Sequence, residues 1–424
     1  MMGVDVFYFL LQEFALIYPL FMAYLWIVGG ITYFIHWEKM GRQRVDQPPQ
    51  LEHYPGVSII VPAHNESYAI LETVEALLDL DYPDIEIIVV NDGSVDNTAE
   101  LIDELADAGK IRVIHLATNQ GKAAAMRVAT LASNHEILVC IDGDAILDRH
   151  ALVWLVRHFE SPRVGAVTGN PRVRTRSTLL GKVQVGEFSS IIGLIKRAQR
   201  IYGRVFTVSG VVAAFRKTAV YRAGFWDLNK LTDDIDISWR LQMDHWAIRF
   251  ESNALCWILM PETLKGLWQQ RLRWAQGGVE VILQHARGLM RWRQRHMWPV
   301  FIEFCLSVIW SYTILILGVS LMIDQITDIP ALPSITEWLP SWGGAIIGVT
   351  CLAQFGISLL IDSRYERGLS KYYFWIIWYP IAYWLLNVFT TIAAVPKTIL
   401  RGRQQRAVWV SPDRGEQFDT DAER

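Results

Sequence analysis

Cysteine is scarce in this chain of 424 residues, which contains only four. Cys140, Cys256, Cys305 and Cys351 lie far apart, and each stands in an apolar stretch. This pattern is typical of buried, reduced thiols, because zinc sites and disulfide frameworks place their cysteines at short, recurrent spacings. We therefore expect neither disulfides nor a structural zinc site.

The sequence also lacks an excess of positive charge and the common nucleotide-binding motifs. Its formal net charge is -3 at pH 7, and no run of arginines alternates with aromatic residues. No nucleic acid is therefore expected among its partners. A Gly-x-x-x-x-Gly-Lys-Ser/Thr loop and a Gly-x-Gly-x-x-Gly fingerprint are both absent, which argues against a P-loop enzyme and against the usual dinucleotide-binding fold.

Hydrophobic residues, in contrast, are abundant: they make up 52% of the chain, which includes 18 tryptophans. A single soluble domain needs fewer hydrophobic residues than this, so part of the chain is expected to lie in a membrane. Four apolar stretches are long enough to cross a membrane, at residues 7–37, 301–323, 342–361 and 372–395. The first lacks a small-residue cleavage site and is followed by Lys39, Arg42 and Arg44. We expect it to be a retained anchor whose charged end faces the cytoplasm.

These stretches and a proline-rich linker divide the chain. We expect a transmembrane helix at 1–37, a linker at 38–56, a cytoplasmic α/β domain at 57–263, amphipathic interfacial helices at 264–298, about three transmembrane helices at 299–396 and a polar tail at 397–424. Three spans after a cytoplasmic domain would place Lys397, Arg401, Arg403 and Arg406 outside, against the positive-inside tendency. Either one stretch is not a full span, or the tail departs from that tendency.

Strands and helices alternate in the α/β domain. Apolar runs at 57–61, 85–90, 112–116 and 137–141 are separated by helical stretches, which predicts right-handed parallel crossovers. Ligands bind outside the carboxyl ends of such strands. The polar residues that follow these strands are His64, Asn65, Glu66, Asp92, Asp142 and Asp144. We expect their loops to meet at one edge of the sheet.

Asp142 and Asp144 come directly after the strand at 137–141 and are separated by Gly143. In a strand, residues i and i+2 project to the same side, and glycine has no Cβ that would keep a ligand away. Two such carboxylates could hold Mg²⁺ or Mn²⁺ and leave coordination positions for a substrate diphosphate. Taken alone, the same residues also fit an ordinary Asp-Gly turn.

Two further positions fit a nucleotide ligand but are weak signals by themselves. Asp92 could accept hydrogen bonds from a nucleoside, and Lys122 opens a helix where it could add positive charge near a phosphate. Each also fits an ordinary turn or helix start.

Thr232, Asp233, Asp234 and Asp236 form an acidic segment that enters a helix at about Ile235. A carboxylate there could be a general base, or it could simply complement the helix dipole. Asp236 points about two hundred degrees around the helix from Asp234. We therefore expect Asp234 and Asp236 to have different roles, and Asp236 only to complement the helix dipole.

The helical stretch 264–289 carries Gln270, Arg271, Arg273 and Trp274 among apolar residues. A basic, tryptophan-bearing amphipathic helix beside a membrane span is expected to lie in the plane of the membrane interface. The arginines could there contact anionic lipid headgroups.

Taken in order, four motifs resemble the signature of processive family-2 glycosyltransferases, the synthases of cellulose, chitin, hyaluronan and poly-N-acetylglucosamine. The motifs are Asp92, Asp142-Gly143-Asp144, Thr232-Asp233-Asp234, and Gln270 with Arg273-Trp274. Within that family, the chain is most similar to the synthases of β-1,6-linked poly-N-acetylglucosamine. The similarity is carried by the segments 164–172, 186–196, 256–268 and 409–415. One departure is Asp233, where the family usually has glutamate.

The resemblance implies a GT-A-like nucleotide-sugar-binding α/β domain inserted between transmembrane helices. It implies that Asp92 and the loop of His64, Asn65 and Glu66 cradle the uridine, and that Asp142 and Asp144 contact the sugar diphosphate, through Mg²⁺ or Mn²⁺. Asp234 would be the base, flanked by Thr232 and Asp233. Arg273 would hold the diphosphate, and Trp274 would stack on the acceptor sugar. Gln270 and Lys122 are further expected substrate-binding residues.

The implied reaction is inverting transfer of N-acetylglucosamine from UDP-N-acetylglucosamine to a growing polysaccharide chain. The implied setting is the bacterial inner membrane, in contact with the lipid bilayer. The resemblance also implies a small membrane accessory subunit and control by cyclic di-GMP. Synthesis of another β-linked polysaccharide, non-processive transfer to a lipid phosphate, and a catalytically inactive nucleotide-sugar-binding protein are the alternatives.

Overall fold

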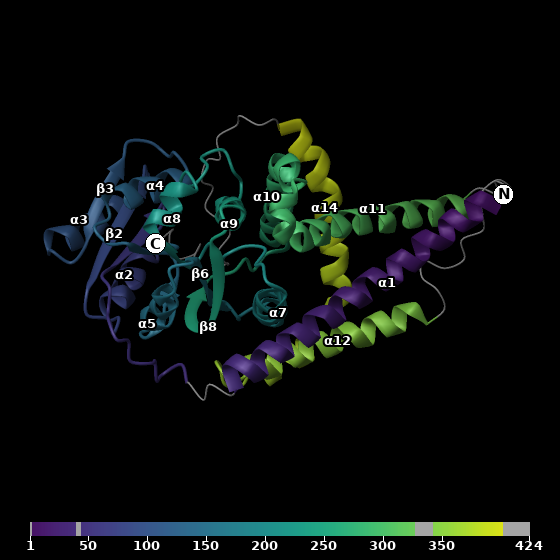
Figure 1. The fold of residues 1–424 in the computed structure, drawn as a ribbon, viewed down its shortest axis with the longest axis horizontal. Helices are drawn as coiled ribbons and strands as arrows, with labels where there is room; N and C mark the ends of the chain where they lie inside the picture. Colours follow the sequence, from purple (N-terminus) through teal and green to yellow (C-terminus); the bar gives the residue numbers. More distant parts are fainter. Residues whose placement is uncertain (1, 40–43, 327–341, 402–424) are drawn as a thin grey trace.

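The computed structural model describes residues 2–39, 44–326 and 342–401. Its centre is a mixed sheet of eight strands in the order β3-β2-β1-β4-β7-β6-β8-β5, and long helices extend from one side of it (Figure 1). Part of the expected linker and the tail beyond residue 401, including Arg403, Arg406 and the segment 409–415, lie outside the described residues.

Four parallel strands form one half of the sheet, as the apolar runs predict. Their bounds are β1 (Val57–Ala63), β2 (Ile85–Asp92), β3 (Arg112–Leu116) and β4 (Ile137–Ile141). The intervening helices are α2 (Ile70–Leu78), α3 (Thr98–Asp107) and α4 (Lys122–Ala132). Parallel strands need such crossover helices, and their carboxyl ends therefore meet at one edge.

The other half of the sheet is mixed, because β7 pairs antiparallel with both β4 and β6. Its strands are β5 (Ile146–Leu147), β6 (Val164–Val173), β7 (Val212–Arg216) and β8 (Ala247–Ile258). Its helices are α5 (Ala151–Val156), α6 (Leu179–Phe188), α7 (Ile195–Tyr202), α8 (Lys217–Arg222) and α9 (Asp233–Met243), with the short turns η2 (Arg157–Glu160) and η3 (Ser189–Leu194).

The sheet is buried on both faces. Consecutive residues Ile59 and Ile60 of β1 are both fully buried, yet they belong to different hydrophobic clusters. Side chains alternate between the faces of a strand, so this arrangement means that helices cover both sides. It explains why the strands are continuous apolar runs rather than alternating ones.

Within the described residues, four helices are long and apolar enough to cross a membrane. They are α1 (Met2–Tyr33), which continues into the π-helical turn η1 (Phe34–Lys39), α11 (Trp298–Ile326), α12 (Gly343–Asp362) and α14 (Tyr379–Arg401). In Figure 1, α1, α11 and α12 run away from the α/β domain together, whereas α14 crosses α11 and lies along α10 (Leu264–Leu289). The turn η4 (Trp292–Met297) connects α10 to α11.

The fourth apolar stretch differs from the expected single helix at 372–395. It is divided into α13 (Ser370–Ile376) and α14, and the candidate span is Ala382–Arg401. Pro380 stands in the first turn of α14. Proline is tolerated at a helix start but disfavours helical geometry at the residue before it, which explains the break at this point.

Buried ion pairs attach the α/β domain to the membrane helices. Arg197 of α7 binds Glu38 at 2.6 Å and Asp362 at 2.9 Å, and Arg172 of β6 also binds Asp362. All four side chains are at most 3% exposed. Removing one partner of a buried pair leaves an uncompensated charge, so these contacts fix how the domain sits on the ends of α1 and α12.

Candidate active site

The loops after β1 and β2 meet, as their strand order predicts. His64 is buried and its Nδ1 lies 2.8 Å from the carbonyl oxygen of Asp92. Asn65 has a positive φ of 55°, and its side-chain oxygen accepts the N–H of Val95 at 2.9 Å. Asparagine tolerates this left-handed conformation better than most residues, so the short loop can turn back across the edge of the sheet.

Asp92 is fully buried at the end of β2 and organises the neighbouring loop. Its two carboxylate oxygens accept the backbone N–H groups of Gln120 and Gly121, both at 2.7 Å. Asn119 of the same loop lies 3.0 Å from His64 Nε2. The carboxylate thus joins the ends of β1 and β2 to the start of α4.

The segment from Asp142 to Asp144 is a turn and not the end of a strand, so the expected side-chain alternation does not apply to it. β4 ends at Ile141, and the N–H of Ala145 donates to the carbonyl oxygen of Asp142 at 3.1 Å. Gly143 is needed for a close approach, because a Cβ there would lie 3.2 Å from Glu66 Cγ. The turn therefore brings Glu66 beside the two aspartates.

Charge accumulates in this turn. Burial, together with the neighbouring carboxylates of Glu66 and Asp142, raises the pKa of Asp144 well above its usual range. Among the described residues, no three His, Cys, Asp or Glu side chains form a group that could hold a metal by themselves. A cation bound here would need oxygen ligands from a substrate as well.

Lys122 links this turn to the next loop. Its ammonium group binds Asp142 and donates to the carbonyl oxygen of Gly210 at 3.0 Å. Burial alone would lower the pKa of Lys122, but the carboxylates of Asp142, Asp233 and Asp234 raise it above its usual value. The lysine is therefore a fixed positive charge among these three carboxylates.

Asp233 and Asp234 occupy the first turn of α9, which begins two residues earlier than expected. Asp233 accepts the N–H of Asp234 at 3.1 Å. Burial and the neighbouring Asp233 carboxylate raise the pKa of Asp234 to about 6. Gly210 leaves room for this group, since a Cβ there would lie 3.2 Å from Asp234 Oδ2.

Lys196 belongs to the same site but was not singled out from the sequence. It is 4% exposed and donates to Thr168 Oγ1 at 3.1 Å. The negative charge of Asp234 favours its protonated form. Burial lowers the pKa of Lys196 to about 7. Its neighbours come from β6 and α9, and no pattern within α7 indicates them.

Asp236 contradicts the expectation that it only complements the helix dipole. It is fully buried and binds Arg240 Nε at 2.7 Å and His285 Nε2 of α10 at 3.1 Å. Burial alone would raise the pKa of Asp236, but His285 and Arg240 lower it below its usual value. Asp236 therefore faces α10 and ties α9 to it, while Asp234 faces Lys122.

Asp236→Asn is accordingly expected to destabilise the protein by about 3–5 kcal/mol, because Arg240 would lose its buried partner. Thermal unfolding of the purified protein in detergent would measure the loss. Asp244→Asn is the matched control, since Asp244 pairs with Arg222 at the exposed end of the same helix, where a pair contributes about 0–1 kcal/mol. Equal melting temperatures for the two variants would contradict this role of Asp236.

Helix α10 packs closely on this site. A Cβ at Gly277 would lie only 1.9 Å from Thr232 Oγ1, so the glycine permits the helix to touch the residue before α9. Arg273 is exposed and makes no hydrogen bond or ion pair within the described part of the chain, although its charge lowers the pKa of both Asp233 and Asp234 against the effect of burial. Arg273 is thus available to a ligand.

The rest of the α10 motif is partly occupied. Arg271 is buried, pairs with Glu187 at 2.6 Å, and lies 4.2 Å from the centre of the Trp274 ring. It also donates to Gln270 Oε1 at 3.1 Å. Trp274 is therefore partly covered, by Arg271 and by the hydrophobic core against which it packs, and only the rest of its ring can contact another group.

Known proteins are similar to this chain over most of its length. The profile of the family described as "Glycosyltransferase like family 2" matches residues 55–277. Poly-beta-1,6-N-acetyl-D-glucosamine synthase of Staphylococcus epidermidis is 38% identical over 407 residues, which cover 95% of this chain and 98% of the relative. The synthase of the same name from Staphylococcus aureus (strain COL) matches with the same identity and coverage.

A solved mannosyltransferase from Pyrobaculum calidifontis, in complex with GDP-Man and Mn²⁺, shares the fold. Its TM-score is 0.61 at 19% identity, over 92% of this chain and 99% of that chain. The fold class expected from the sequence, a GT-A-like α/β domain between membrane helices, is confirmed. The chain belongs to glycosyltransferase family 2, in the group of the poly-β-1,6-N-acetyl-D-glucosamine synthases.

Proposed function

We propose that the protein polymerises N-acetylglucosamine from UDP-N-acetylglucosamine into a β-1,6-linked chain and passes that chain into the membrane. The observation that carries the proposal is the half-buried carboxylate of Asp234, which lies near Lys122 and the exposed Arg273 at a site from which α10 leads to the span α11. The 38% identity to synthases of this name supports the choice of sugar and linkage.

The donor would occupy the edge formed by the loops after β1, β2 and β4. Asp92 would position the loop 119–121, whose backbone N–H groups it accepts, on one side of the uridine. The loop with His64 and Asn65 would line the other side. Lys122 lies at the amino end of α4, where positive charge and free N–H groups favour a phosphate.

A divalent cation, Mg²⁺ or Mn²⁺, fits the turn formed by Asp142 and Asp144. Glu66 and Asp142 already raise the pKa of the buried Asp144, so the site holds more negative charge than Lys122 balances. Carboxylate and phosphate oxygens are the ligands that these cations prefer. When bound, the cation would neutralise charge on the diphosphate as the bond to the sugar breaks.

Asp234 would then serve as the general base. It would take the proton from the acceptor hydroxyl while that oxygen attacks the anomeric carbon, and the UDP diphosphate would leave on the opposite side. Arg273 and Lys122 would stabilise the negative charge that develops on the leaving group. One such displacement inverts the anomeric centre and gives a β linkage from an α-linked donor.

The pH profile follows from the state that the base requires. Asp234 must be ionised, and its pKa is raised to about 6 by burial and by Asp233. We therefore expect kcat/KM for the donor to fall as pH drops below about 6, because kcat/KM reports groups of the free enzyme. Asp233→Asn removes a repelling charge and should move this acidic limb to lower pH. An unmoved limb would argue that another group titrates there.

Trp274 is proposed to stack the exposed part of its ring on the acceptor sugar. Trp274→Ala should shorten the polymer and leave the KM for UDP-N-acetylglucosamine nearly unchanged, whereas Trp274→Phe, which keeps an aromatic face, should retain most of the chain length. Product size and donor KM are measured together. Trp268→Ala on the same helix is the control for lost packing, and a matching loss there would indicate a packing role for Trp274.

The surroundings of the enzyme remain proposals drawn from resemblance. The α/β domain is expected on the cytoplasmic face of the bacterial inner membrane, where UDP-sugars occur. A small membrane accessory subunit and control by cyclic di-GMP are expected partners. Each is tested by asking whether polymer yield in membranes depends on it.

One incubation separates this function from its rivals. Membranes containing the protein are incubated with radiolabelled UDP-N-acetylglucosamine, UDP-glucose or GDP-mannose. The proposal predicts a long polymer from UDP-N-acetylglucosamine alone. A long polymer from another donor would indicate a different polysaccharide, a lipid-linked monosaccharide would indicate non-processive transfer to a lipid phosphate, and no product from any donor would indicate a protein that only binds the nucleotide sugar.

A further inference from the structure

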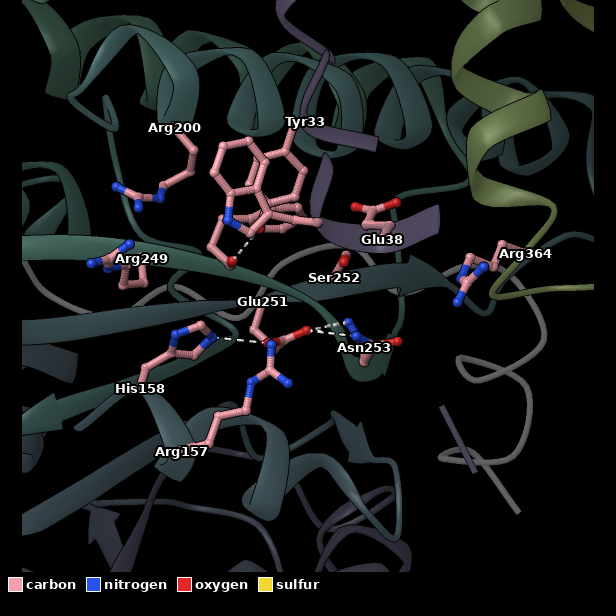
Figure 2. Close-up of a pocket in the computed structure, with 12 residues that line it drawn as sticks. Tyr33, Glu38, Arg157, His158, Arg200, Arg249, Glu251, Ser252, Asn253 and Arg364 are labelled. Atoms are coloured by element: carbon pink, nitrogen blue, oxygen red, sulfur yellow. Dashed lines mark hydrogen bonds and ion pairs between the residues drawn. The ribbon is translucent and has the colours of Figure 1, made fainter. Parts of the chain in front are cut away.

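A second pocket lies between the end of α1, α7 and β8, and none of the proposed donor-site or acceptor-site residues lines it (Figure 2). Its volume is about 50 Å³. On this measure one water molecule needs about 10–15 Å³, so the pocket has room for a compact group the size of a few water molecules.

Two arginines give this pocket an unbalanced positive charge. Arg200 donates to the carbonyl oxygen of Ile248 at 3.1 Å and has no carboxylate partner among the described residues. The side chain of Arg249 makes no hydrogen bond or ion pair in the part of the chain that the structure describes. Burial, and then the charge of Arg249, lowers the pKa of Arg200 to about 10. Figure 2 shows both guanidinium groups on the same side of Tyr33.

The acidic residues of the pocket do not balance these two arginines, because they are already paired elsewhere. Glu38 binds Arg197 at 2.6 Å. Glu251 lies 2.9 Å from His158 Nε2 and 3.1 Å from Arg157. Like charges held together in a partly buried site are unfavourable unless an anion joins them, so the pocket is complementary to a negatively charged group.

The pocket lies at the ends of two candidate membrane spans. Tyr33 and Trp37 stack with ring centres 5.3 Å apart near the end of the candidate span Val6–Lys39, and Trp37 is 59% exposed. Tyrosine and tryptophan gather at the headgroup level of a bilayer. Arg364, which also lines the pocket, follows the end of the span α12 by two residues.

We propose that this pocket binds the phosphodiester of an anionic phospholipid headgroup. Arg200 and Arg249 would hold the phosphate oxygens, since guanidinium groups bind phosphate in a forked geometry. Tyr33 and Trp37 would pack against the glycerol and the first part of the acyl chains. The volume admits the phosphate, and the membrane supplies the rest of the lipid at this level.

The site has a structural route to the catalytic centre. Arg200 and Lys196 lie four residues apart on α7, which is about one helical turn. The charge of Asp234 raises the pKa of Lys196 against the effect of burial. Arg197, between them, anchors α7 to Glu38 and Asp362. A bound headgroup would therefore stabilise the helix that carries a neighbour of the base.

The test uses the full-length protein, purified in a neutral detergent, and measures its melting temperature during titration with dioctanoyl-phosphatidylglycerol. We expect this lipid to stabilise the protein at concentrations where dioctanoyl-phosphatidylcholine and the soluble diester glycerophosphoglycerol do not. The phosphatidylcholine arm tests for net negative charge, and the soluble diester tests whether the acyl chains are needed.

Arg249→Gln is the main variant, because the Arg249 side chain makes no hydrogen bond or ion pair within the described residues whose loss would disturb folding. It should weaken the apparent affinity for phosphatidylglycerol about tenfold or more, the usual effect of removing a hydrogen bond to a charged group. Arg200→Gln should do the same. Arg367→Gln, an exposed arginine three residues beyond Arg364 that does not line the pocket, should bind the lipid like the unmodified protein.

Equal lipid affinity in Arg249→Gln and Arg367→Gln would overturn the proposal. Equal stabilisation by phosphatidylcholine, or stabilisation by glycerophosphoglycerol at the same concentrations, would overturn it as well. These readouts report binding alone. They hold even if the donor or the linkage proposed above is wrong.

Discussion

Asp234→Asn is expected to lower polymer formation by about a hundredfold or more, the usual scale for removing a general base. Asparagine keeps the shape of the side chain but cannot accept the proton from the attacking hydroxyl. Asp234 lies in the first turn of α9, where it accepts the N–H of Ile235 at 2.9 Å, and an asparagine oxygen can accept the same bond, so the substitution should leave the neighbouring groups in place. UDP-N-acetylglucosamine binding should therefore survive.

The measurement is polymer yield and donor affinity on the same preparation of purified protein. Asp244→Asn provides the matched control, because it makes the same substitution at the other, exposed end of α9. It should retain nearly full activity. An Asp234→Asn protein as active as this control would show that the base is another residue.

Removing divalent cations is expected to have a comparable effect. A diphosphate beside Asp142 and Asp144 brings about four negative charges within a few ångströms, which repel strongly in a buried site. A cation that offsets this charge is worth several kcal/mol in the transition state, so EDTA should lower turnover at least about hundredfold. Added Mg²⁺ or Mn²⁺ should restore it.

Asp144→Asn is the companion variant for the metal. It should raise the Mg²⁺ concentration needed for half-maximal turnover, because one of the proposed ligands loses its charge. The melting temperature should not fall on EDTA treatment, which separates loss of the cation from unfolding. Polymerisation at an undiminished rate in EDTA would contradict a metal at this turn.

Local sequence patterns were sufficient for the positions of the strands and for the meeting of their loops. Ile137–Ile141 and Arg112–Leu116 form strands with the predicted bounds. The first is a continuous apolar run, as expected for a buried strand of a parallel sheet, and the second is the edge strand. His64 and Asp92 consequently lie in contact. These features depend on hydrophobic periodicity and on strand order, and both can be read from the chain itself.

Features that depend on distant partners could not be predicted in this way. Asp236 is buried because His285, 49 residues away, reaches it from α10. Lys196 joins the site because β6 and α9 close around it. The Asp142–Asp144 segment forms a turn that Glu66 approaches, whereas a rule based on strand alternation places both carboxylates on one face without that turn.

The most direct test of the proposed function is the structure of the product made by the purified protein from UDP-N-acetylglucosamine and Mg²⁺. Methylation analysis gives the linkage, and the anomeric proton coupling in the NMR spectrum gives the configuration. Inverting polymerisation with Asp234 as base predicts a long chain of β-1,6-linked N-acetylglucosamine. An α-linked product, or a single sugar attached to lipid, would contradict it.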